Sequence, residues 1–560
     1  MKIINNLKNR VDFKFIATFF LTLIAVTISS AAILFIVSSH INGFLFIIDY
    51  LLTIGLMNVF YKKKLGTKKI LDNIIIASIL FFILCTISTI FYDFSYDGND
   101  YHKQLIGLLK NGVNPIYNYQ SGSIWTNHYA NGSEVWSAVL YAFTDNIETG
   151  KVINLLLAFA LCFISFDYIY KKSDRPILSA LFSLALAFNP IVLAQFHTYY
   201  IDGIVDLSLI TLILALVIII DGKQDFSDKA NYLILASSII ICVNAKFTAL
   251  LLAMLFAGLL GGFTFIYNLV KKNSKFAWKY FALMACIFAF AVGIVGSSSY
   301  VKNTLTHGNP FYPLKGEGAV DIETDNEPKS FSEFSNTKKF LYGTFSKSYT
   351  WYDQEPQLKI PFTIYRSEFE SIQFPDVRIG GLGMWFSGMF IISMVVILVS
   401  LLIMIKNKIK EAWIVGILLV GILLPIPILP IVWQARYYPE IYLLPFIALT
   451  ILLSYKSSKF SLSKCVAYGL LFITVVNTLF FVPQVHQTLR ASNIANDSLT
   501  YLAEQSLTKK VIISPAGDVF NGVYYNYIDK GIKFEYQAEP LENGNLLYRG
   551  MLYKIVEENE

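Results

Sequence analysis

The chain has 560 residues, of which 55% are hydrophobic and only 15% are charged, and its mean hydropathy is +0.54. About a quarter of the residues in a typical soluble domain are charged, so this composition excludes an ordinary soluble protein and indicates that lipid covers much of the chain. The formal net charge of +6 does not indicate nucleic-acid binding, because Lys and Arg lie between the apolar segments, where they set membrane topology.

Thirteen apolar segments predict an all-α polytopic membrane protein. Many of them are about 20 residues long and nearly free of charge, which lets a helix cross roughly 30 Å of hydrocarbon. The predicted spans are 15–39, 42–60, 71–92, 151–170, 177–196, 203–220, 231–245, 247–270, 280–300, 382–405, 412–432, 441–455 and 465–482. The first apolar run is too long for a cleaved signal sequence, so we interpret it as a retained span.

The distribution of positive charge predicts which ends of the spans face the cytoplasm. With the N-terminus inside, seven short inner connections hold 24 of the 45 Lys and Arg residues. These connections are 1–14, 61–70, 171–176, 221–230, 271–279, 406–411 and 456–464. The short outer turns near residues 40, 200, 246 and 436 hold only two basic residues, Lys246 and Arg436. The positive-inside rule then predicts a multi-pass protein of the cell membrane (inner or plasma membrane), with a cytoplasmic N-terminus.

Three large segments fall on the predicted outer side, namely 93–150, 301–381 and 483–560. We therefore expect a transmembrane domain over residues 1–482 and an extracytoplasmic C-terminal domain over residues 483–560. The latter contains a polar helical stretch at 484–506, followed by strand-like runs at Lys510–Ser514 and Ile532–Gln537. This order predicts a small α+β domain.

The densest group of reactive side chains follows the third predicted span. Asp93, Asp97, Asp100 and His102 lie within ten residues of one another at the expected membrane surface. A carboxylate placed there can accept a proton from an attacking hydroxyl group. The alternative is a solvated acidic turn in which Asp100 caps the following helix.

A second polar group occupies the outer turn at residues 195–206. Tyr200 and Asp202 precede an apolar run, and Asp206 lies one helical turn beyond Asp202, on the same face. A carboxylate at Asp206 is costly inside a bilayer unless it faces a partner or a wet cavity. The alternative is an interfacial aromatic belt in which Asp202 caps a helix.

The outer side also carries three isolated cations, Lys246, Lys302 and Arg436. The alternative for Lys246 is a side chain that extends to the lipid headgroups. Arg436 follows Pro425, Pro427 and Pro430, which break regular helical hydrogen bonding. Broken backbone at membrane depth is tolerated only where it is buried in protein or lines a cavity.

This separation of acids from cations is what sugar transfer from a phosphate-linked lipid requires. A carboxylate takes the proton of the acceptor hydroxyl. The cations stabilise the phosphate as negative charge builds on it. Phosphate leaves readily, so a second carboxylic acid is not needed, unlike in glycoside hydrolysis.

The motif Ser95-Tyr96-Asp97-Gly98 at the start of a large outer loop resembles the GT-C class of glycosyltransferases, polytopic enzymes that use polyprenyl- or dolichyl-phosphate sugars outside the cytoplasm. Together with Tyr101-His102 and with Gly112, Asn114 and Pro115, it is also similar to a group of bacterial membrane proteins associated with surface polysaccharides. Later landmarks are Asn309–Pro313, Gly380–Gly383 and Ala435–Tyr437, so the resemblance spans roughly residues 70–450.

The resemblance implies an inverting transferase that moves a sugar from a polyprenyl-phosphate donor to a glycan or lipid acceptor of the cell envelope. Asp97 is then the general base, with Asp93 or Asp100 as alternatives. The phosphate ligands would be Lys246, Lys302 and Arg436, and the sugar or acceptor contacts would be His102, Tyr200 and Asp202. Two spans precede the motif-bearing one, whereas many enzymes of this class place the acid after their first span. The carboxylates form no tight pair, so the participation of a divalent cation, Mg²⁺ or Mn²⁺, stays open.

Other functions remain compatible with the sequence. A transporter or flippase for lipid-linked saccharides would favour ionisable groups near the bilayer centre and repeated broken helices. A polymerase acting on lipid-linked oligosaccharides is close to the transferase in its chemistry. A structural scaffold fits least, because it explains neither the outer carboxylates nor the proline-broken span.

Overall fold

The structure is a computed structural model, which describes residues 11–118, 123–222, 225–322, 326–350, 354–454, 462–516, 521–547 and 551–556. Most of the predicted N-terminal connection and of the connection at 456–464 lies outside the described residues. The protein is mostly helical, with one small sheet near the C-terminus.

Ten helical segments of the described chain are long and apolar enough to cross a membrane. Each overlaps a predicted span. They are α2 (Phe13–Ile36), α3 (Gly43–Leu65), α4 (Thr67–Ile90), η2 with α8 (Ile147–Ser173), α11 (Asp202–Asp221), α13 to α14 (Phe247–Val270), α15 with η4 (Ser274–Ser298), α19 (Phe386–Lys406), α20 with α21 (Glu411–Ile428) and α23 with α24 (Leu462–Gln505). These segments confirm a multi-pass membrane protein.

The other three predicted spans coincide with shorter apolar helices, namely α9 (Pro176–Ala187), α12 (Lys229–Ala245) and η9 with α22 (Pro439–Ser454). The prediction of one helix over 177–196 is wrong, because a second helix, α10 (Pro190–Gln195), begins within it. Asn189 caps α10 by accepting hydrogen bonds from two backbone amides, and the proline that follows starts the new helix.

The centre of the bundle is formed by α2, α8 and α11, whose apolar windows are the most buried of the ten. Helices α3, α4 and α19 leave most of the residues in their apolar windows partly or fully exposed, including Leu51, Phe82 and Leu402. An exposed apolar face on a helix of spanning length is the surface expected against lipid.

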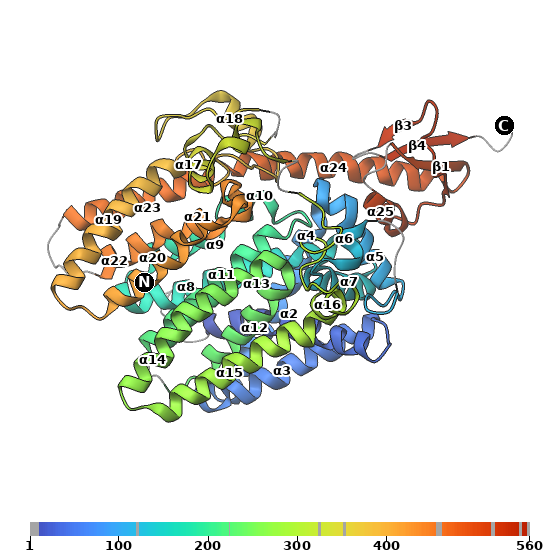
Figure 1. Ribbon diagram of the computed structural model, residues 1–560. Coiled ribbons are helices and arrows are strands. Elements are labelled where there is room, and N and C mark those ends of the chain that lie inside the picture. Colours follow the sequence, from blue (N-terminus) through green and yellow to red (C-terminus); the bar gives the residue numbers. More distant parts are fainter. Residues whose placement is uncertain are drawn as a thin grey trace.

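The large segments predicted to share one side gather at one end of the bundle (Figure 1). The first contains η1 (Gly98–His102), α5 (Lys103–Lys110), α6 (Ile124–His128) and α7 (Gly132–Thr144). The second contains α16 (Tyr300–His307), η6 (Lys329–Glu333), α17 (Asn336–Phe345) and α18 (Arg366–Ser371). The prolines break the chain after α20 (Glu411–Leu423) as predicted, into α21 (Pro425–Ile428), η7 (Pro430–Trp433), η8 (Ala435–Tyr437) and η9 (Pro439–Tyr442).

The C-terminal region has the predicted α+β character. Helix α24 (Val482–Gln505) runs from the bundle to a small sheet (Figure 1). The sheet has the order β2-β1-β4-β3, in which β1 and β2 are parallel and the other pairs antiparallel. Its strands are β1 (Lys510–Pro515), β2 (Glu535–Tyr536), β3 (Asn545–Leu547) and β4 (Met551–Val556), and α25 (Tyr524–Asp529) follows β1 along the chain.

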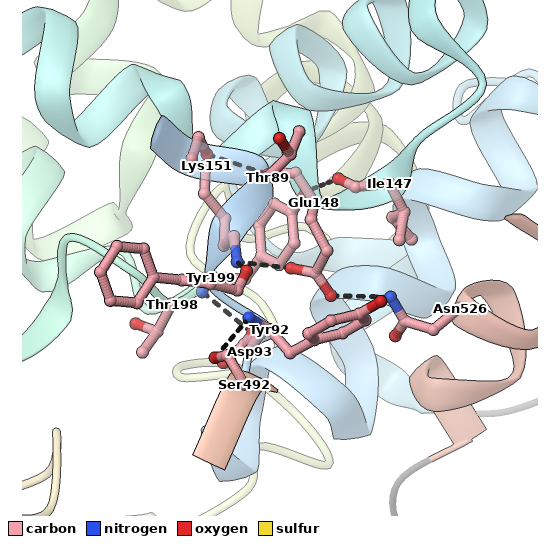
Figure 2. Close-up of polar contacts among 12 residues, drawn as sticks. Thr89, Tyr92, Asp93, Ile147, Glu148, Lys151, Thr198, Tyr199, Ser492 and Asn526 are labelled. Atoms are coloured by element: carbon pink, nitrogen blue, oxygen red, sulfur yellow. Dashed lines mark hydrogen bonds and ion pairs between the residues drawn. The ribbon is translucent and has the colours of Figure 1, made fainter. Parts of the chain in front are cut away.

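A buried ionic network fastens this region to the membrane bundle (Figure 2). The carboxylate of Glu148, at the start of the η2–α8 segment, lies 2.7 Å from the ammonium of Lys103 and 2.5 Å from that of Lys151. Asn526 of α25 donates a hydrogen bond of 2.8 Å to Glu148 and accepts one of 2.9 Å from Lys103. All four side chains are buried.

Glu148→Gln tests this anchor. The substitution leaves Lys103 and Lys151 buried without their carboxylate, and breaking a buried pair typically costs about 3–5 kcal/mol. We expect a large fall in the temperature at which the detergent-solubilised protein unfolds and aggregates.

Asp167→Asn is the matched control, because it breaks the more exposed Asp167–Lys171 pair of α8. Surface pairs contribute about 0–1 kcal/mol, so this variant should unfold close to the wild-type temperature. Equal small shifts in both variants would contradict the anchoring role of Glu148.

Candidate functional site

Asp93 shapes the turn that carries the acidic motif. One of its carboxylate oxygens accepts a hydrogen bond of 2.7 Å from the amide of Ser95, and the other accepts one of 3.0 Å from the amide of Tyr199. A Cβ at Gly98 would lie 2.0 Å from Asp93 Oδ2, so only glycine fits there. Asp93 is fully buried (Figure 2), and it ties the first loop to the turn before α11.

The next segment of the site comes from the end of the long loop and from the proline-broken region. The amide of Ala435 donates a hydrogen bond of 2.9 Å to the carbonyl of Arg378. This bond aligns residues 376–378 with residues 434–436 and brings Asp376 next to Arg436. A Cβ at Gly381 would lie 2.8 Å from that of Ala435, which shows how closely the two segments pack.

Arg436 is the centre of the site. Its Nε lies 2.9 Å from a carboxylate oxygen of Asp376. Its Nη1 lies 3.4 Å from Asp97 Oδ2 and 3.5 Å from Asp202 Oδ2. The guanidinium also lies over the ring of Tyr200, 5.0 Å from its centroid. Carboxylates from three segments far apart in the sequence therefore meet at one cation.

Lys246 completes the cluster from the turn between α12 and α13. Its Nζ lies 2.6 Å from Asp202 Oδ1 and 3.8 Å from the centroid of the Tyr437 ring. Gln195 donates a hydrogen bond of 3.2 Å to Asp202 Oδ2 and another of 3.3 Å to the carbonyl of Pro375. Lys246 is 9% exposed and is paired with Asp202, which disfavours the alternative in which its side chain extends to the lipid headgroups.

The charges of this cluster balance. Arg378 Nη2 lies 3.0 Å from Asp376 Oδ2, so a second guanidinium supports the carboxylate nearest to Arg436. Three cations, Lys246, Arg378 and Arg436, thus neutralise three carboxylates, Asp97, Asp202 and Asp376. We call these six residues the ion cluster. Pairing of this kind offsets part of the penalty of burying the charges, and removal of one partner would leave the other uncompensated.

Asp97 is the most accessible carboxylate of the ion cluster. Its side chain is 24% exposed, compared with 16% for Asp376 and 2% for Asp202. Partial burial raises the pKa of Asp97 above its usual value, Arg436 opposes this increase, and the negative charge of Asp376 adds to it. An accessible carboxylate with a raised pKa has the properties of a general base.

The remaining predicted residues lie around this cluster. Asp100 lies inside η1 and not at its N-cap, so the alternative in which it caps a helix is wrong. Burial and the charge of Asp97 raise the pKa of Asp100. The Nδ1 of His102 is hydrogen-bonded to Glu134, and its buried Nε2 has no partner among the described residues. Tyr200 is buried against Arg436.

Lys302 stands apart from the other two predicted cations. Its ammonium donates hydrogen bonds of 2.7 Å to the carbonyl of Pro115 and 3.4 Å to that of Asn127. These contacts hold α16 against the first loop. The contacts found among the described residues do not link Lys302 to the ion cluster, so its predicted role as a phosphate ligand has no support from geometry.

Sequence reasoning missed Asp376, Arg378 and Glu134. The first two lie in Pro375-Asp376-Val377-Arg378, immediately before the Gly380–Gly383 landmark, and an Asp-x-Arg sequence beside glycines was the available signal. Glu134 lies 32 residues after His102, and only the packing of α7 against the first loop brings them together.

No group of three or more His, Cys, Asp and Glu side chains in the described part of the chain is placed to hold a metal ion. The three carboxylates of the ion cluster are each engaged by a cation. The role of Mg²⁺ or Mn²⁺ stays a prediction, and we derive no step through a metal.

No model of a known protein family matches the chain, and a search of curated proteins finds no match either.

Matched substitutions distinguish the two neighbouring acids. Asp93→Asn replaces a buried acceptor of two backbone hydrogen bonds, and a bond to a charged group contributes about 1.5–3 kcal/mol. We expect this variant to unfold at a clearly lower temperature in detergent. Asp97→Asn keeps two carboxylates on Arg436 and should change stability by less than about 1 kcal/mol. The reverse order would contradict the assignment of Asp93 to structure.

Proposed function

We propose that this protein is a membrane glycosyltransferase that moves a sugar from a polyprenyl-phosphate donor to a glycan or lipid acceptor of the cell envelope. One observation carries the proposal. An accessible carboxylate of the first loop, Asp97, pairs with Arg436, and a second cation, Lys246, binds the Asp202 carboxylate that also contacts Arg436. A lipid-borne phosphate would reach such a cluster at the depth of its headgroup.

The proposed reaction is a single displacement at the anomeric carbon of the donor sugar. The acceptor oxygen forms the new bond to that carbon, and the bond from the carbon to the phosphate oxygen breaks. The bonding electrons leave with the phosphate, and the proton of the acceptor hydroxyl passes to Asp97. Attack from the face opposite the phosphate inverts the configuration of the sugar.

Arg436 and Lys246 have the charge that the leaving group needs. A guanidinium can bind two phosphate oxygens at once, and an ammonium acts as a compact charge beside them. Both are largely buried, where electrostatic stabilisation exceeds that in water. Tyr200 and Tyr437, whose rings lie against these cations, are proposed to border the sugar.

We further propose that the site faces the non-cytoplasmic side of the cell membrane, with the N-terminus in the cytoplasm. Support comes from the charge asymmetry of the connections. The gathering of the three large segments at one end of the bundle agrees with this orientation (Figure 1).

A second candidate function, transport of a lipid-linked saccharide, is favoured by a different observation. Glu440 is fully buried, and neither of its carboxylate oxygens has a hydrogen-bond partner among the described residues. Asp206 is equally buried and accepts one hydrogen bond, of 2.5 Å, from Asn189. Buried carboxylates at membrane depth commonly mark ion or proton paths.

Asp97→Asn separates the two functions. Given a polyprenyl-phosphate sugar and an envelope-lipid acceptor in detergent, the wild-type protein should form the glycoside. A pure transporter would form no glycoside, because it needs a sealed bilayer and makes no new bond. The amide cannot accept the proton, so we expect at least about a hundredfold loss of turnover. Asp100→Asn removes the same charge from the same turn and should retain most activity. Full activity of Asp97→Asn would remove Asp97 as the base.

Two substitutions should shift the pH dependence of turnover in opposite directions. Asp97 must be ionised to act as a base, so turnover rises with pH through its raised pKa. Arg436 lowers the pKa of Asp97 and Asp376 raises it. Arg436→Gln should therefore move the acidic limb to higher pH, and Asp376→Asn should move it to lower pH. The value of kcat/KM for the donor is measured from pH 4 to 9, because it reports the pKa of Asp97 in the donor-free protein, and shifts of the same sign would contradict the arrangement.

Arg436→Gln should also change the two Michaelis constants unequally. Loss of the guanidinium should raise KM for the donor by about tenfold or more, while KM for the acceptor changes little. An unchanged donor KM would reject the assignment of Arg436 to the phosphate.

A further inference from the structure

Arg436 is already neutralised before any substrate binds. Its guanidinium lies within 3.5 Å of carboxylate oxygens from Asp97, Asp202 and Asp376. A phosphate cannot approach the same nitrogens without meeting these negative charges at short range, where repulsion is strong. Binding an anion here therefore requires one carboxylate to leave.

Two of the three carboxylates are held by other partners. Asp376 is the nearest to Arg436, at 2.9 Å, and is also bound by Arg378. Asp202 is bound by Lys246 at 2.6 Å and by Gln195 at 3.2 Å, and its side chain is only 2% exposed. Moving either one would break a second ion pair as well.

Asp97 is held least. Among the described residues its ion pair is with Arg436 alone, and the distance of 3.4 Å is long for a charge-assisted hydrogen bond. It is also the most exposed of the three, so its carboxylate can turn toward solvent without entering an apolar environment. Its backbone lies at the start of η1, beyond the turn that Asp93 fixes, so its side chain can move while the turn stays in place.

We infer that the phosphate of the donor replaces Asp97 at Arg436, so that binding of the donor releases the base. This inference rests on the proposed function and adds an order to it, in which the donor binds before the acceptor is deprotonated. Without donor, Asp97 remains paired with the guanidinium. With donor bound, it faces an acceptor hydroxyl beside a phosphate.

The exchange also changes how strongly Asp97 holds a proton. Loss of the nearby cation and gain of a nearby anion both favour the protonated carboxyl. The charged groups that face Asp97 from the surrounding elements are Asp100, His102, Asp202, Lys246, Asp376 and Arg436. Of these, the inferred exchange changes the contact with Arg436. Binding of an anion should therefore raise the pKa of Asp97 further and cause proton uptake at pH values near that pKa, while above it Asp97 stays ionised and able to act as the base.

The test measures binding of polyprenyl monophosphate, which carries no sugar, to the detergent-solubilised full chain. Asp97→Asn removes the competing charge and should bind this probe about tenfold more tightly than the wild type. Asp100→Asn is the matched control, because it removes a charge from the same turn without a direct ion pair to Arg436, and its dissociation constant should stay within about twofold. Equal or weaker binding by Asp97→Asn, or equal tightening in both variants, would overturn the exchange.

A second measurement keeps the inference testable if Asp97→Asn folds poorly. Calorimetric titration of the wild type with polyprenyl monophosphate, in buffers of different ionisation enthalpy at a series of pH values from 4 to 7, reports the protons taken up. Methyl dodecyl phosphate, a diester with no second ionisation, repeats the titration without proton changes on the ligand itself. Net uptake with the diester supports the exchange, and no uptake overturns it.

These binding readouts are independent of transfer. If the exchange is observed but no sugar moves in detergent, the proposed transferase fails and the anion site stands. If sugar moves and the variants bind the probe equally, the transferase stands and the exchange fails.

Discussion

A guanidinium buried beside a membrane must be neutralised by carboxylates, and Arg436 places this requirement on three segments of the chain. Asp97 comes from the first loop, Asp202 from the start of α11 and Asp376 from the end of the long loop. Lys246 and Arg378 occur because those carboxylates must in turn be satisfied. Segments far apart in the sequence thus lie together because their charges must neutralise one another in a region of low dielectric.

The acidic loop owes its position to contacts on both sides. On the membrane side, Asp93 accepts the amide of Tyr199 and fixes the loop to the turn before α11. On the other side, Gly522 packs so closely on Asn99 that a Cβ there would lie 2.8 Å from the Asn99 carbonyl oxygen. The network around Glu148 holds the C-terminal region in this place. The C-terminal region therefore matters to the site through the first loop, which Gly522 and Asn526 contact.

The sequence was informative where composition or backbone chemistry determines structure. Spans could be located because roughly 20 apolar residues are needed to cross a bilayer, and the break after α20 because proline cannot donate a backbone hydrogen bond. The boundary inside 177–196 was missed, because Asn189 acts through its side-chain cap and hydropathy does not register it. The charge asymmetry predicted that Asp97, Lys246 and Arg436 lie on the same side of the membrane. That they lie close to one another could be learned only from the packing of the helices.

Other features of the site were not predictable in this way. Asp93 and Asp97 are four residues apart and chemically identical, yet one is a structural acceptor and the other faces a cation. Only the direction of each side chain separates them. Lys302 and Lys246 are both isolated cations in predicted outer segments, yet the ammonium of Lys302 binds two carbonyl groups of the first loop. Side chains that bind backbone leave no signal in composition, because any turn can supply a carbonyl oxygen.

Charge balance also bears on the proposed reaction. A donor phosphodiester adds one negative charge to a cluster that is otherwise neutral. During transfer the phosphate gains a second negative charge as the sugar leaves, and Asp97 loses its own when it takes the proton. The total charge around Arg436 is therefore the same before and after the step, and the cations need not move to follow it. A fixed, buried arrangement is then an advantage, because stabilisation by preorganised charges requires no reorganisation at the moment of reaction.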